Sequence, residues 1–173
     1  MKNVAVIAIL DLLGRYDTLS PLTPSVNDYF VKLTTGHKVV MGKNTYDFLV
    51  AKLGPLEGQQ VLLDRECFVI THKPEEVQFA TPISDIGVLN LDLLKDGEVK
   101  AFFIGGVASW APGLQLADEC HMAVFDKGFE SDSFFDTNYL LDNFTVSEKI
   151  LSEHEGLAFL TFKRKGQQLE AEV

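Results

Sequence analysis

The sequence predicts an α/β fold built on a mostly parallel central sheet, with a C-terminal antiparallel hairpin and flanking helices. Short apolar runs rich in Val, Ile and Phe, which are typical of buried strands, alternate along the chain with helical or turn-rich stretches. Strands joined by helical crossovers lie parallel to one another. The last two apolar runs instead flank a short turn-prone segment, 153–156, and this arrangement is typical of an antiparallel hairpin.

Seven apolar runs define the predicted strands. The five expected in the buried part of the sheet are Val4–Leu10, Lys38–Met41, Glu66–Thr71, Ala101–Ile104 and His121–Phe125. The two expected to form the closing hairpin are Phe144–Leu151 and Leu157–Arg164.

The clearest helix lies between the first two predicted strands. Thr23 is suited to cap its N-terminus, and Pro24 suits the first helical position because a proline lacks the N–H that is unpaired there. The apolar stripe consists of Val26, Tyr29, Phe30 and Leu33, spaced i, i+3, i+4 and i+7. Periodicity alone explains this stripe as core packing.

Composition bounds the function classes. A chain of 173 residues suits one domain, expected over 1–173, and its 46% hydrophobic and 23% charged residues are an ordinary globular balance. The formal net charge of −10 argues against non-specific nucleic-acid binding, which depends on Lys and Arg neutralising phosphates. It is compatible with one anionic ligand held in a local basic pocket.

Several features predict a cytoplasmic protein without a membrane span or a metal site. No apolar run reaches the roughly 18 residues that a spanning helix needs, and the N-terminal run is followed at once by Asp11 and Arg15, which favours a strand over a secretory signal. Cys67 and Cys120 form no CxxC motif and are expected to be reduced structural thiols. The histidines are scattered, without metal-ligand spacing.

Two predicted strands end in glycine. The first runs into Gly42-Lys43-Asn44-Thr45, which combines a backbone open to close approach with a cation and a hydroxyl. At the start of a helix such a segment can bind a phosphate, although an ordinary strand–helix turn explains it equally well. The second runs into Gly105-Gly106, which also allows close approach to a pyrophosphate but is not a G-x-G-x-x-G fingerprint.

Two further segments carry polar groups. Thr71-His72-Lys73 follows a predicted strand with a hydroxyl, an imidazole and an ammonium, a set able to hold a ribose phosphate or simply to form a solvated loop. Ser131-Asp132-Ser133-Phe134-Phe135 is a polar turn into two aromatic residues, and alone it indicates only the start of a strand.

Taken in order, these segments resemble the dihydrofolate reductase family over nearly the whole chain. Residues 33–46 look like that family's run of helix, strand and cofactor-binding turn, and Ile104-Gly105-Gly106 looks like its second nucleotide-contacting turn. The segment 131–135 resembles its Gly-Asp-Thr-Phe-Phe signature, and Leu157–Arg164 resembles its last strand.

The resemblance implies an NADP-dependent oxidoreductase of folate and one-carbon metabolism that acts on a small folate- or pterin-like substrate. The implied cofactor contacts are Lys43, Asn44, Thr45, Thr71, His72, Lys73, Gly105 and Gly106. The implied substrate contacts are Ile9, Val26, Phe30, Leu49, Arg65 and Trp110. Arg65 corresponds to the arginine that binds the carboxylate of the folate tail, a geometry suited to bidentate hydrogen bonding.

The chain departs from the family pattern at the catalytic acid. The position of the family's helix carboxylate, four residues before Phe30, is Val26, and the position of its partner hydroxyl is Ala123. Asp28 is expected about 200° around the helix from Val26, pointing away from the apolar stripe. Asp11 and Asp17 are possible replacements, so the catalytic residue is left unassigned.

Two other segments differ in length from the family. The loop 14–23 is shorter, and 50–64 is longer, which alters the rim of the expected pocket. Three functions remain open at this point: an NADPH-dependent reductase of dihydrofolate or a related pterin, a reductase of the same fold acting on the ribosylamino-pyrimidine of riboflavin synthesis, and a non-catalytic nucleotide- or pterin-binding protein.

Overall fold

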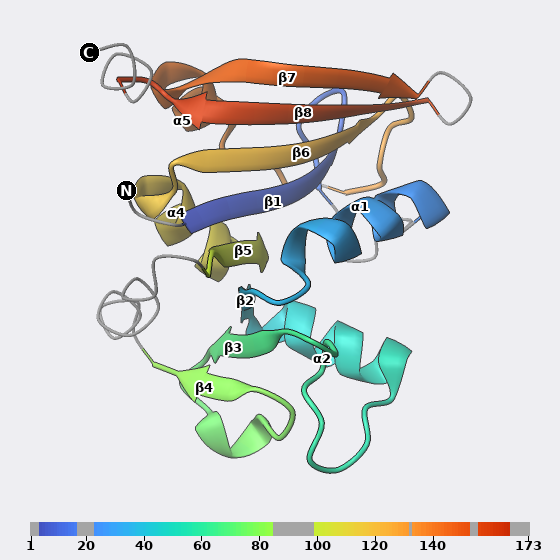
Figure 1. Ribbon diagram of the computed structural model, residues 1–173, viewed down its shortest axis with the longest axis vertical. Coiled ribbons are helices and arrows are strands. Elements are labelled where there is room, and N and C mark those ends of the chain that lie inside the picture. Colours follow the sequence, from blue (N-terminus) through green and yellow to red (C-terminus); the bar gives the residue numbers. More distant parts are fainter. Residues whose placement is uncertain (1–3, 17–22, 85–98, 132, 153–155, 167–173) are drawn as a thin grey trace.

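The computed structural model describes residues 4–16, 23–84, 99–131, 133–152 and 156–166. Its centre is an eight-stranded sheet in the order β4-β3-β2-β5-β1-β6-β8-β7, which runs from bottom to top in Figure 1. The strands are β1 (Val4–Asp11), β2 (Lys38–Gly42), β3 (Glu66–Ile70), β4 (Thr81–Ile83), β5 (Ala101–Gly105), β6 (Glu119–Phe125), β7 (Phe144–Ser152) and β8 (Leu157–Arg164).

The pairing confirms the predicted fold class. Neighbouring strands from β4 to β6 are parallel, whereas β8 pairs antiparallel with β6 and β7 pairs antiparallel with β8. Each of the seven predicted strands is present, with ends shifted by no more than two residues. The short strand β4 was not predicted, because three residues containing Pro82 carry no alternation and a proline suits only an edge strand.

The helices are α1 (Pro24–Thr34), α2 (Lys43–Leu53), α4 (Val107–Leu116) and α5 (Thr137–Asn143), with a 3-10 turn η1 (Pro74–Glu76). The predicted start of α1 is confirmed, because Thr23 Oγ1 accepts a hydrogen bond from Val26 N at 3.4 Å and Pro24 is the first helical residue. None of the described helices is long and apolar enough to cross a bilayer.

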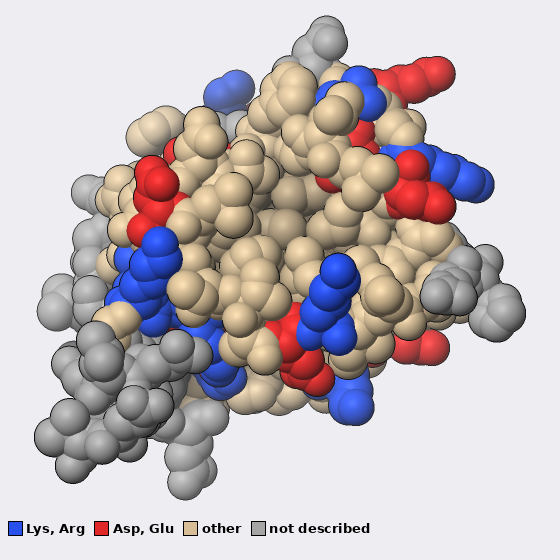
Figure 2. All heavy atoms as spheres, turned by 90° about the horizontal axis from the view of Figure 1, so that it is seen from above, with Lys and Arg blue, Asp and Glu red and all other residues tan. Residues whose placement is uncertain are grey.

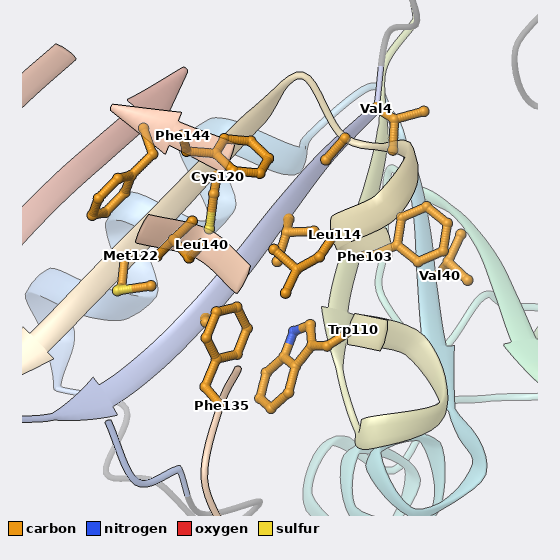
Figure 3. Close-up of a cluster of buried hydrophobic side chains, with 14 of the residues drawn as sticks. Val4, Val40, Phe103, Trp110, Leu114, Cys120, Met122, Phe135, Leu140 and Phe144 are labelled. Carbon is orange, nitrogen blue, oxygen red and sulfur yellow. The ribbon is translucent and has the colours of Figure 1, made fainter. Parts of the chain in front are cut away.

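Helices cover both faces of the sheet. Alternate residues of β1 face opposite sides: Val4, Val6, Ala8 and Leu10 join a core cluster with α4 and α5 residues, while Ala5 and Ile7 join a second cluster with α1 and α2 residues. Figure 3 shows the first cluster, in which Trp110 and Leu114 of α4 lie close to Phe135 and Leu140. A third cluster lies beneath the start of α1.

Charged side chains are mixed on the surface. On the face shown in Figure 2, Lys and Arg side chains alternate with Asp and Glu, and neither sign forms a continuous patch.

Candidate functional site

A cleft of about 540 Å³ lies between α1, α2 and the ends of β1 and β5. Its wall is mostly apolar, as expected of a small-molecule site. The residues that line it are Ile7, Ile9, Tyr16, Pro24, Asn27, Asp28, Phe30, Thr45, Phe48, Leu49, Lys52, Leu53, Leu62, Ile104, Gly105, Gly106 and Trp110. Among the predicted contacts, the lining includes Ile9, Phe30, Leu49 and Trp110 from the substrate set and three residues of the cofactor set.

Two glycine turns form one end of the cleft. A Cβ atom on Gly42 would lie 3.6 Å from Gly105 O, 3.8 Å from Gly106 Cα and 3.9 Å from Ala108 Cβ, so the two turns lie close together. A Cβ atom on Gly105 would lie only 3.1 Å from Thr45 Oγ1, and Gly106 has φ +85°, which L side chains rarely adopt. The N-termini of α2 and α4 therefore lie side by side, at the carboxyl edge of the parallel strands, where phosphate groups bind in this architecture.

The predicted cofactor residues gather at this edge of the sheet. Lys43, Asn44 and Thr45 form the first turn of α2, which begins where β2 ends, and Thr71-His72-Lys73 follow the adjacent strand β3. Thr71 is buried, and its Oγ1 accepts a hydrogen bond from Lys73 N at 2.9 Å. Lys43 forms ion pairs with Asp47 at 2.7 Å and with Glu76 at 3.2 Å.

Arg65, a predicted substrate contact, does not itself line the cleft but is held against Phe30, which does. The guanidinium lies 5.7 Å from the centre of the Phe30 ring, donates from Nε to Leu63 O at 2.9 Å and donates from Nη1 to Thr34 Oγ1 at 3.1 Å. These two bonds use two of the five N–H groups of the guanidinium, which leaves three for other partners. Burial lowers the pKa of Arg65, but an arginine stays charged throughout the physiological range. A fixed cation therefore stands beside the apolar wall.

Trp110 also lines the cleft. Its Nε1 donates to Ile7 O at 3.0 Å, and its ring packs edge to face on Tyr16, with centroids 4.5 Å apart, and on Phe135 at 5.3 Å. Phe135 comes from the predicted segment 131–135, so that polar turn contributes a buried aromatic support for the cleft wall, whereas Phe134 is exposed.

Val26 lies behind the cleft wall and not on it, in contrast to its predicted substrate contact. Val26 and Ala123 are 1% and 2% exposed and belong to one apolar cluster with Phe125, Phe129 and Leu157. The two positions expected to carry the family's acid and its hydroxyl partner are thus brought together, and both side chains are apolar.

The other aspartates differ in their surroundings. Asp28 was expected to point away from the apolar stripe of α1, and its side chain is exposed, in agreement with this expectation. It nevertheless borders the cleft, together with Pro24 and Asn27. Asp17 lies outside the described residues. Among those residues, no group of three or more His, Cys, Asp or Glu side chains could hold a metal ion.

Asp11 is buried and fully engaged at the end of β1. Its carboxylate accepts hydrogen bonds from the backbone N–H groups of Leu13, Arg15 and Phe129 at 2.8–2.9 Å, and it pairs with Arg15 Nε at 2.7 Å. Burial alone raises the pKa of this carboxyl, but the donors outweigh it and lower the pKa to about 2. An anion this strongly held suits the support of a turn and does not suit a proton donor at neutral pH.

Sequence reasoning predicted Thr45 and Leu49 of α2 as site residues but missed Phe48 and Lys52 of the same helix. All four residues line the cleft. They are spaced i, i+3, i+4 and i+7, so they share one face of the helix. That spacing is legible in the sequence and would have identified this face, including Lys52, as part of the site.

Comparisons with known proteins agree with this geometry. The family model described as dihydrofolate reductase matches residues 3–164. The chain is 28% identical over 162 residues to the dihydrofolate reductase of Bacillus subtilis, covering 89% of this chain and 88% of that protein. It is 27% identical over 169 residues to the dihydrofolate reductase HdrB of Haloferax volcanii, covering 95% and 84%.

Among solved structures, the fold matches a dihydrofolate reductase from Enterococcus faecalis complexed with NADP(H) and RAB-propyl. The TM-score is 0.76 at 17% sequence identity, and the match covers 95% of this chain and 98% of that chain.

Proposed function

Because the chain belongs to the dihydrofolate reductase family, we propose that it is an NADPH-dependent reductase that transfers a hydride to dihydrofolate or a related pterin. The observation that carries this proposal is the cleft itself. Its lining includes Gly105 and Gly106, which lie beside Gly42, and Phe30, whose ring lies against Arg65.

The residues present suit a dinucleotide with phosphate groups. The glycine turns leave space for the backbone of a dinucleotide, and a Cβ atom at these positions would reduce that space. The N-termini of α2 and α4 lie beside the turns. Gly105, Gly106 and Thr45 would hold the dinucleotide against Trp110, while Lys43 and Lys73 provide the cations for its phosphates. The bound cofactor supplies the hydride, and the protein orients it toward the acceptor.

The substrate end provides orientation without a side-chain acid at the usual position. An apolar wall with Phe30, Leu49 and Ile9 suits a flat heterocycle, and Arg65 suits a carboxylate on its tail. Val26 offers no proton, and Asp11 is held as an anion. The proton that accompanies the hydride then comes from solvent, before or after hydride transfer.

NADPH oxidation in the presence of dihydrofolate, followed from about pH 5 to pH 8, tests this function. We expect slow turnover at neutral pH that rises by up to about tenfold per unit as pH falls, because solvent must protonate the substrate. A rate that is independent of pH over this range would contradict solvent protonation. Complete absence of turnover with bound NADPH would contradict the reductase function.

One observation favours a second candidate, a non-catalytic nucleotide- or pterin-binding protein. Val26 and Ala123 together replace the family's acid and its partner by a packed apolar pair. Turnover separates the two candidates, because a binding protein would bind NADPH and dihydrofolate without oxidising the nucleotide at any pH in the range.

Substitution of Arg65 tests the substrate end. We expect Arg65→Leu to raise KM for dihydrofolate about 10- to 100-fold, since a charge-assisted hydrogen bond is worth about 1.5–3 kcal/mol. The dissociation constant for NADPH, measured by calorimetry, should not change. A pterin without the glutamate tail is the matched control, and equal losses with both substrates would show that Arg65 supports only the fold.

We also propose that the chain forms one domain over 1–173 and works in the cytoplasm. Cys67 and Cys120 are both buried free thiols, and burial raises the pKa of each, which favours the unreactive protonated form. Such thiols suit a reducing compartment.

A further inference from the structure

A carboxylate lies between the two lysines proposed for the cofactor phosphates. Glu76 Oε2 is 3.2 Å from Lys43 Nζ, and Glu76 Oε1 is 4.0 Å from Lys73 Nζ. The two cations come from different segments, one from the first turn of α2 and one from the residues that follow β3. Glu76 is therefore the group that bridges them.

Backbone hydrogen bonds within its own segment fix the main chain of Glu76. It ends the 3-10 turn η1, where its backbone N–H donates to Lys73 O at 3.1 Å and Val77 N donates to Pro74 O at 3.2 Å. Lys73 is tied to Thr71 in turn, through the bond from its N–H to Oγ1. The glutamate is thus carried by the segment that presents Lys73, and a change of rotamer is enough to move its carboxylate away.

Lys43 is further engaged from its own helix. Asp47, one turn along α2, accepts from Lys43 Nζ through both carboxylate oxygens at 2.7 and 2.9 Å. This hydrogen bond, reinforced by Glu76, raises the pKa of Lys43. Two carboxylates therefore already neutralise the cation that an incoming phosphate would use.

We propose that Glu76 is a specificity-determining residue, whose carboxylate occupies the anion position between Lys43 and Lys73 and must be displaced by the 2′-phosphate of NADP(H). This inference rests on the proposed function. A dinucleotide without the 2′-phosphate does not compete with Glu76. The ratio of the affinity for NADP(H) to that for NAD(H) is therefore lower than it would be if Glu76 left both lysines unpaired.

The expected size of the effect follows from the charges. A phosphate monoester carries about −1.5 to −2 at neutral pH, so it repels a carboxylate that stays nearby and gains more from lysines that are not already paired. Glu76 is about half exposed, with a side-chain exposure of 46%, so solvent and salt screen the interaction. We expect removal of its charge to strengthen NADP(H) binding about threefold to tenfold.

Isothermal titration of NADP⁺ and NAD⁺ against the wild type, Glu76→Gln and Glu75→Gln tests the inference. Glu75 is the exposed neighbour on the same turn, so its substitution changes net charge equally and serves as the matched control. We expect Glu76→Gln to lower the Kd for NADP⁺ about threefold to tenfold, with the Kd for NAD⁺ unchanged and the Glu75 variant close to wild type.

Each other outcome overturns a stated part of the inference. An equal gain for both nucleotides, or an equal gain from both variants, would show a general charge effect and contradict a specific role for Glu76. Unchanged binding of NADP⁺ by the Glu76 variant would contradict the inference while leaving the proposed function intact. If the wild type bound neither nucleotide, the proposed function would fail as well. The ratio of the two dissociation constants is taken within one protein, so partial unfolding of a variant does not alter it.

Discussion

Val26→Asp is expected to increase the rate of dihydrofolate reduction at neutral pH by about 10²- to 10⁴-fold, the usual contribution of a positioned general acid. This corresponds to about 3–5 kcal/mol of the activation barrier. Val26 lies behind the cleft wall, in a buried cluster with Ala123, Phe125, Phe129 and Leu157 against which Ile9 of the cleft lining packs. Burial in such a cluster raises the pKa of a carboxyl group and keeps it protonated at neutral pH, as a proton donor requires.

The same burial makes the substitution costly for folding. A carboxyl group without a partner in an apolar cluster destabilises the fold by about 1–3 kcal/mol. Ala123 lies in the same cluster as Val26, so Ala123→Thr offers a hydroxyl partner. We expect the double variant Val26→Asp/Ala123→Thr to recover part of the lost stability and to retain the increase in rate.

Steady-state kinetics at pH 7, with NADPH and dihydrofolate both saturating, measure the effect. Val26→Asn is the matched control, because it has nearly the shape of the aspartate variant without its proton, and its kcat should stay near that of the wild type. If the asparagine and aspartate variants gained equally, polarity and not proton donation would explain the change. If neither gained, an acid elsewhere in the protein would already supply the proton.

The sequence predicted the central sheet well because each buried strand is a short apolar run bounded by turn residues. The N-terminus of α1 was also predictable, since Thr23 and Pro24 satisfy the chemistry of a helix start. The glycine turns were recognisable because glycines directly follow two of the predicted strands; in the structure, a Cβ atom on Gly105 would lie 3.1 Å from Thr45 Oγ1, and Gly106 has φ +85°. These features depend on local chemistry, which a sequence displays directly.

Features that depend on distant partners were not predictable in the same way. From the sequence, Asp11 was a possible replacement for the catalytic acid. In the structure, however, its carboxylate accepts four hydrogen bonds, and one of the donors is the N–H of Phe129, far along the chain. The ion pair of Lys43 with Glu76 likewise joins two segments through the pairing of β2 with β3. The pairing of Val26 with Ala123 was the exception, because the family resemblance had already linked those two positions.

Asp11→Asn is expected to destabilise the protein by about 2–4 kcal/mol at neutral pH, because it removes the charge of a buried carboxylate that accepts four hydrogen bonds, one of them from the partly exposed Arg15 side chain. The pKa of Asp11 is lowered from 3.8 to about 2 in the folded protein. A lowered pKa contributes stability that is present above pH 3.8 and is lost as pH falls toward 2. The difference between wild type and variant should therefore shrink over that interval.

Urea unfolding of both proteins at pH 7 and at successively lower pH values measures this difference. Asp28→Asn is the control, because Asp28 also borders the cleft but is exposed, and its stability should stay within about 0.5 kcal/mol of the wild type. Asp11 holds the turn that leads to Tyr16, whose ring packs on Trp110 in the cleft wall. A structural role thus predicts a loss of stability with turnover still measurable in the fraction that remains folded. A variant with wild-type stability but no turnover would instead identify Asp11 as the missing acid.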